Sequence, residues 1–284
     1  DARFVSLSES GNSIGTLSGR SYAGTFDVRT AGAMTVSTVD GTAGISASTT
    51  GGITVQAGGV LTVNGNVSAP SASVTMTGAG ITLNTTRTIY ASSGVSLNAG
   101  GGVMNLGQGT VSSLGSIQLT NAASTTLGSI SALTGGLSLN SITGNVSQQV
   151  GTSIAAGLLS GGSNSGVINL SNTGNNFIGI GTLSTSGGGL TVVDGTDNLN
   201  ISGAVSAPSG TVNIRTPGSI SQSQQVSSGA AGDSIVLSAG TNYFNTAGAT
   251  GLSATHASGR WLVYLSSPSG NNFGGLNSVN SAVW

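Results

Sequence analysis

The sequence predicts an all-β fold, a right-handed parallel β-helix (β-solenoid) with roughly 20–23 residues per coil. Three observations support this. A short apolar–polar–apolar unit recurs at a nearly fixed interval, the alternation inside each unit has the two-residue period of a strand, and clusters of Gly, Asn and Ser-Ala-Pro separate the units. A fixed period with several short strands per repeat is typical of a solenoid in which every repeat forms one coil.

Alignment on the first apolar residue of each repeat gives two series of positions. They are Met34, Ile53, Val74, Val95, Ile117 and Leu137, followed by Val167, Leu190, Val212 and Ile235. The intervals are 19, 21, 21, 22 and 20 residues in the first series and 23, 22 and 23 in the second. The step of 30 residues between the series predicts an irregular or inserted coil near 141–166. We therefore expect solenoid repeats over 1–240 and an aromatic-rich C-terminal coil or cap over 241–284.

In such a solenoid, Val, Ile, Leu and Met face inward, and Ser, Thr and Asn face water. Equivalent strands of neighbouring coils stack about 4.8 Å apart. The pentapeptide VSAPS occurs at 67–71 and again at 205–209, and a similar alternating stretch follows each copy, so we predict two copies of one structural unit. A β-sandwich also contains many short strands, but its strand spacing is less regular than the period seen from residue 34 to 235.

Composition limits the chemistry that the chain can perform. Gly accounts for 49 of 284 residues and charged residues for only 5 %, against about 25 % charged residues in an average soluble protein. Because the sequence has neither Cys nor Lys, it has no disulfide, thiol nucleophile, thiolate metal site or Schiff-base lysine. The net charge of −1 argues against nucleic acid and anionic membranes as partners. No apolar run of about 18 residues is present, so we predict no membrane span.

Candidate catalytic residues are few, and we predict no enzyme activity, no cofactor and no metal. The only close pair of acids is Asp194 and Asp197 in VVDGTDNLN, where the Asp-Gly step predicts a solvated turn and a weak cation site is the alternative. The same VDGT tetrapeptide at 39–42 favours a repeated corner. His256 is the only histidine and lacks the partners of a zinc site or a catalytic triad. A carbohydrate-active β-helix enzyme, which needs clustered acids, is the less favoured alternative.

Aromatic residues are concentrated at one end of the sequence. Six of the eleven follow residue 242, and RWLVY at 260–264 is apolar on both faces of the predicted strand. We expect this segment to form a C-terminal cap that covers the open end of the apolar interior, with PSGNNFGG at 268–275 folding back over it. A sugar-binding or partner-binding platform is the alternative. The candidate capping or partner-contact residues are Trp261, Tyr264, Phe273 and Trp284.

The repeats resemble those of filamentous-haemagglutinin-type exoproteins, the large β-helical adhesins that bacteria export by two-partner secretion. The resemblance rests on GGITVQAGGVLTVNGNVSAPSASVTMTGAGITLN, on GSIQLTNAAS and on the closing GRWLVYLSSPSGNNFGGLN, and it extends over nearly the whole chain. It implies an internal or C-terminal part of the exported β-helix, located outside the cell or on the bacterial surface. The family's N-terminal secretion domain is not visible in the sequence.

We therefore expect a non-enzymatic extracellular structural β-solenoid that acts as an adhesin stalk or as a surface or matrix component. Its partners would be host or surface glycans and proteins, or further copies of itself. The first alternative is a subunit that assembles head to tail into an extracellular filament, because low net charge weakens the repulsion between copies.

Overall fold

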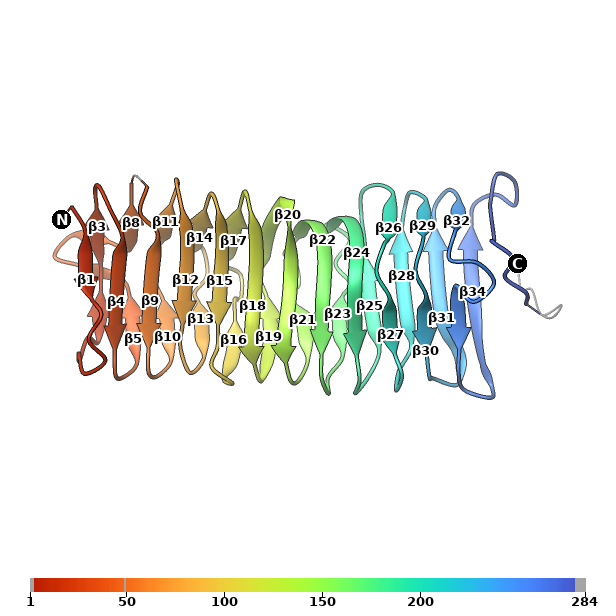
Figure 1. Ribbon diagram of the computed structural model, residues 1–284, viewed down its shortest axis with the longest axis horizontal. Coiled ribbons are helices and arrows are strands. Elements are labelled where there is room, and N and C mark those ends of the chain that lie inside the picture. The colour runs from red at the N-terminus through yellow and green to blue at the C-terminus, as the bar shows by residue number, and fades with distance from the viewer. Residues whose placement is uncertain (1–2, 49, 279–284) are drawn as a thin grey trace. The chain divides into compact units, whose positions relative to one another are not determined.

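The computed structural model describes residues 3–48 and 50–278 and confirms the β-solenoid. In these residues the regular secondary structure consists of strands, and they pair in parallel apart from one short hairpin (Figure 1). The chain divides into two compact units, residues 1–142 and 143–284. Each unit contains three ladders of parallel strands, and one coil of the chain contributes a strand to each ladder in turn.

The N-terminal unit contains ladders 1, 2 and 3. Ladder 1 consists of β1 (Val5–Leu7), β4 (Phe26–Thr30), β9 (Ile53–Ala57), β12 (Ser73–Thr77), β15 (Gly94–Asn98), β18 (Ser116–Ala122) and the second half of β20 (Ser129–Ile142). Ladder 2 consists of β2 (Thr16–Leu17), β5 (Met34–Val36), β10 (Leu61–Val63), β13 (Ile81–Leu83), β16 (Val103–Asn105) and β19 (Ser124–Leu127). Ladder 3 consists of β3 (Gly19–Ser21), β8 (Ile45–Ala47), β11 (Val67–Ala69), β14 (Thr88–Ala91), β17 (Thr110–Ser113) and the first half of β20. The hairpin pairs β6 (Thr38–Val39) with β7 (Thr42–Ala43).

Register in the N-terminal unit confirms most of the predicted repeat and corrects its first position. Ile53, Val74, Val95, Ile117 and Leu137 are successive partners in ladder 1. Met34 is not one of them, because it pairs with Leu61 in ladder 2, and the partner of Ile53 is Phe26. The prediction was wrong here because every strand of a coil has the same apolar–polar–apolar pattern. The β6–β7 hairpin also lengthens this coil, so the correct interval could not be recognised by its length.

The C-terminal unit contains ladders 4, 5 and 6. Ladder 4 consists of β21 (Val146–Gln148), β23 (Ile168–Leu170), β25 (Leu190–Val193), β28 (Val212–Thr216), β31 (Gly232–Ala239) and β34 (Gly259–Leu265). Ladder 5 consists of the first halves of β22 (Ile154–Ser163) and β24 (Asn176–Thr185), then β26 (Leu199–Ile201), β29 (Ile220–Gln222) and β32 (Tyr243–Asn245). Ladder 6 consists of the second halves of β22 and β24, then β27 (Val205–Ala207), β30 (Val226–Ser228) and β33 (Leu252–Ala254).

Register in the C-terminal unit corrects a second repeat position. Leu190 pairs with Ile168 and not with Val167. Ile168 is buried, whereas Val167 faces outward and is 39 % exposed. Ile168 also pairs with Val146, 22 residues earlier, so the residues between these two positions form a coil of ordinary length. The predicted domain boundary at residue 240 stays a prediction.

Inward and outward side chains alternate along the strands, as the sequence predicts, and the inward side chains form the core. In β12, Val74 and Met76 are fully buried, whereas the alternating residues Thr75 and Thr77 are partly exposed. The strands β12, β15 and β18 lie side by side (Figure 1), and their inward residues stack on equivalent residues of the neighbouring coils. Both VSAPS copies form a short strand, β11 or β27, that is followed after a turn by a five-residue strand, β12 or β28.

Candidate functional site

The final strand of the C-terminal unit, β34, contains the predicted aromatic segment. Trp261, Val263 and Leu265 continue the inward row that Ile235, Leu237 and Ala239 form in β31. The three β31 residues are buried, whereas those of β34 are partly exposed, because within the described residues β34 pairs with β31 alone. Tyr264 faces outward and is 45 % exposed. The end of the apolar interior therefore remains partly accessible along β34.

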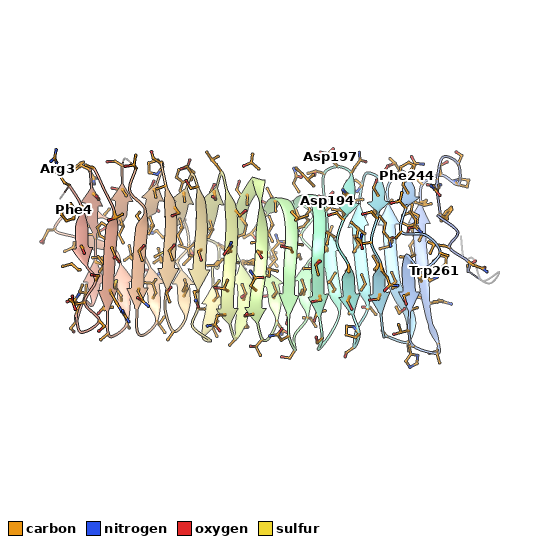
Figure 2. The ribbon with its side chains drawn as sticks, viewed as in Figure 1. Arg3, Phe4, Asp194, Asp197, Phe244 and Trp261 are labelled. Carbon is orange, nitrogen blue, oxygen red and sulfur yellow. The ribbon has the colours of Figure 1, made fainter. Side chains whose placement is uncertain are left out.

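A hollow of about 430 Å³ lies against this strand. It is lined by Val263, Tyr264, Leu265, Ser267 and Pro268, so most of its wall is apolar. Trp261 lies at the same end of the C-terminal unit (Figure 2) and lines a second hollow together with Leu252 of β33. The chemistry of the first hollow suits an apolar side chain more than a charged ligand, whereas Arg260 lines the second hollow.

After β34 the chain folds back as a segment that we name the strap, residues 267–276. Asn272 forms a parallel bridge with Phe244 of β32. The Asn272 amide donates to the Tyr243 carbonyl at 2.9 Å, and the Asn272 carbonyl accepts from the Asn245 amide at 2.7 Å. Asn271 Oδ1 accepts from the Tyr243 amide at 2.9 Å. The strap thus forms one further short rung on ladder 5.

A buried polar network lies beneath the strap. The Tyr243 hydroxyl donates to Gln222 Oε1 at 2.6 Å, and Gln222 Nε2 donates to the Gly251 carbonyl at 2.6 Å. Asn245 is also buried, and its Nδ2 donates to the carbonyls of Gly248 and Phe273. Burial raises the pKa of Tyr243 above the ordinary value of a tyrosine. Each side-chain amide here has partners, so the polar groups are compatible with the end of the core.

The structure brings together only some of the predicted site residues. Phe273 contacts the ring of Tyr243, with the ring centroids 5.9 Å apart and the planes inclined at 49°. Trp261 and Tyr264 lie on β34, and Trp284 lies outside the described residues. Their roles in capping or partner contact stay predictions. Sequence reasoning missed the network of Gln222 and Tyr243, although the polar Gln222 at an inward strand position was a detectable signal.

The predicted solvated turn at Asp194 and Asp197 is wrong for Asp194. Asp197 is exposed, but Asp194 is only 1 % exposed and lies at the corner that follows β25 (Figure 2). Asp194 Oδ1 accepts from the Phe177 amide at 2.9 Å, and Oδ2 accepts from the Thr216 hydroxyl at 2.8 Å. The carboxylate therefore caps the beginning of β24 in the preceding coil and links it to Thr216 of β28 in the following coil.

Asn175 occupies a comparable corner one coil earlier. Its Oδ1 accepts from the Ile154 amide at 2.9 Å, as Asp194 Oδ1 does from Phe177. Asn175 also exchanges hydrogen bonds with the Gln148 side chain. This parallel indicates a structural role for both side chains. Within residues 3–48 and 50–278, no three His, Asp or Glu side chains lie close enough together to hold a metal ion.

The remaining ionisable candidates form local contacts. His256 is exposed, and its Nδ1 contacts the Ser258 hydroxyl at 2.9 Å in a turn. Arg260 forms an ion pair with Asp233 of the preceding coil, and this hydrogen bond raises the pKa of Arg260. No described acid contacts His256, so the pair with Ser258 lacks the group that would orient a catalytic imidazole.

Ladder 1 presents an uncharged outward face over five successive coils. Two side-chain columns run through it in register: Thr54, Thr75, Ser96, Gln118 and Ser138, and Gln56, Thr77, Asn98, Thr120 and Asn140. Hydroxyl and carboxamide groups donate and accept hydrogen bonds and carry no net charge. The coil before these five differs, because Asp27 and Arg29 occupy the equivalent positions in β4.

In comparisons with known proteins, no family model, no curated protein and no solved structure matches this chain. Among the described residues, none belongs to a helix of the length and apolarity needed to cross a membrane.

Proposed function

We propose that this chain is a non-enzymatic structural β-solenoid of the filamentous-haemagglutinin type, serving outside the cell or on the bacterial surface as an adhesin stalk or matrix component. The observation that carries the proposal is the pair of neutral in-register columns on ladder 1. A regular, uncharged hydrogen-bonding surface over an apolar interior suits a stalk, since it is wetted by water and offers no chemistry for turnover.

The corner at Asp194 supports the non-enzymatic part of the proposal. A glycosidase needs two carboxyl groups that both reach the substrate. Asp194 is buried, with its two oxygens bonded to neighbouring coils, while Asp197 is exposed. The two acids therefore do not form such a pair.

Localisation and adhesion test the proposal together. Antibodies raised against the purified chain should label intact cells of the source organism as strongly as permeabilised cells. Beads coated with the chain should adhere to a host or abiotic surface more than beads coated with albumin. Labelling that requires permeabilisation would rule out the surface location, and equal adhesion by both kinds of bead would rule out the adhesive role.

Assembly into a filament by head-to-tail stacking is the second candidate function. The unpaired edge of β34, within the described residues, favours it, because the inward row of Trp261, Val263 and Leu265 is only partly covered. Negative-stain microscopy at increasing protein concentration tests it: filaments that lengthen with concentration are expected, and discrete particles at every concentration contradict it.

A further inference from the structure

The strap covers the outer edge of β32 and forms hydrogen bonds to it with few residues. Three backbone groups of Tyr243 and Asn245 form hydrogen bonds to the strap, namely both amides and the Tyr243 carbonyl. The Tyr243 amide donates to Asn271 Oδ1, the Tyr243 carbonyl accepts from the Asn272 amide, and the Asn245 amide donates to the Asn272 carbonyl. One bridging residue and one side chain thus replace a whole strand.

The strap is held mainly by side-chain amides and one ring contact. Asn245 Nδ2 donates to the Phe273 carbonyl at 3.0 Å, and Asn242 Nδ2 donates to the Ser269 carbonyl at 3.1 Å. Phe273 packs on Tyr243. A contact of this kind has no continuous ladder of backbone bonds, so it can detach without unfolding the coils beneath it.

Charge does not oppose contact between two copies at this edge. Residues 241–246 and 267–276 contain no ionisable side chain apart from the buried Tyr243 hydroxyl, which donates to Gln222. An uncharged edge with free amides and carbonyls is a template for pairing with another strand. Two identical edges can pair antiparallel about a two-fold axis, which closes the contact as a dimer.

We infer that the strap is an autoinhibitory contact, which covers the edge of β32 and prevents it from pairing with the same edge of a second copy of this chain. The latent interaction surface is the backbone of Tyr243–Asn245, and the partner is the equivalent strand of the other copy.

A pair of substitutions at one position tests the inference. Asn272→Pro removes the amide that donates to the Tyr243 carbonyl, whereas Asn272→Ala keeps that amide and removes only the side chain. Sedimentation velocity on the full chain should show the Pro variant with about twice the mass of the unsubstituted chain at the same concentration. The Ala variant should match the unsubstituted chain. Hydrogen exchange at the Tyr243 and Asn245 amides, measured at a protein concentration too low for pairing, reports whether the strap has been released.

Each result has a defined meaning. Faster exchange at these amides with unchanged mass would overturn the inference, since the exposed edge would not recruit a second copy. Unchanged exchange in the Pro variant would overturn it too, since the strap would not be what protects β32. If Asn272→Pro fails to fold, the double variant Asn271→Ala with Phe273→Ala removes the side-chain acceptor and the ring contact. It should raise exchange at the concentration too low for pairing and raise the mass at the higher concentration.

Discussion

The same four residues, VDGT, form two different structures in this chain. At 39–42 they make the hairpin of β6 and β7, with Asp40 and Gly41 at positive φ (47° and 79°) and with the Asp40 side chain exposed. At 193–196 they make a tight corner, with Asp194 buried and bonded to the coils on both sides. The four residues alone therefore do not decide which structure forms.

Close stacking of coils explains the corner at 193–196. A Cβ on Gly195 would lie 1.7 Å from the Thr173 carbonyl oxygen, whereas a Cβ on Gly41 would meet nothing within 4 Å. In the corner, backbone contact between coils demands glycine. In the hairpin, only the turn conformation demands it, since a type I′ turn requires positive φ at both central positions.

The largest expected effect is the difference in the free energy of unfolding between alanine variants at these two glycines. Gly195→Ala must displace the Thr173 backbone, so we expect a loss of at least about 3 kcal/mol in the free energy of unfolding. Gly41→Ala meets only the cost of a positive φ, about 1 kcal/mol. Urea denaturation of the two variants measures the difference, and equal losses would refute the stacking argument.

The second-largest expected effect is the loss of stability when the aspartate of either VDGT copy, Asp194 or Asp40, is replaced by alanine. Asp194→Ala leaves the Phe177 amide and the Thr216 hydroxyl without this acceptor in a buried corner, so a loss of about 2–3 kcal/mol is expected. Asp40→Ala, on the exposed hairpin, should cost less than about 1 kcal/mol. Hydrogen exchange of the Phe177 amide should accelerate only in the Asp194 variant. A comparable loss of stability in both would show that burial of Asp194 contributes nothing.

The third-largest expected effect concerns Tyr243, which is a buried ionisable group like Asp194. Tyr243→Phe leaves Gln222 Oε1 without its donor, which should cost about 1–3 kcal/mol at neutral pH. Because burial raises the folded-state pKa of Tyr243, the folded chain retains this proton above pH about 10, where the unfolded chain loses it. Stability of the unsubstituted chain should therefore fall more steeply above pH about 10 than that of the Phe variant. Parallel pH profiles would contradict the assignment.

The smallest effect should come from Asp194→Asn. The carboxamide oxygen can still accept from the Phe177 amide, and its NH₂ group can donate to the Thr216 oxygen, as the Asn175 amide does in its own corner. We expect a change within about 1 kcal/mol. A loss as large as that of Asp194→Ala would mean that the negative charge itself is required, and calcium titration followed by calorimetry would then test the cation alternative.

Strand periodicity predicted the solenoid but not the ladder to which each strand belongs. Ile53, Val74 and Val95 were assigned to one face correctly because their coils have nearly equal length. Met34 was misplaced because all strands of a coil show the same alternation. The candidate site was predicted less well: Trp261 and Tyr264 lie on a strand as expected, but the contact of Phe273 is with Tyr243.

The strand period, the inward and outward alternation, the near absence of charge and the position of the aromatic segment can all be read from the amino-acid order. These properties are local, because each depends on residues within one coil. The burial of one VDGT copy, the strands that share a ladder and the bonds between the strap and β32 became known from the folded chain alone. Those properties depend on the coils above and below, which are about twenty residues away along the chain and in direct contact in space.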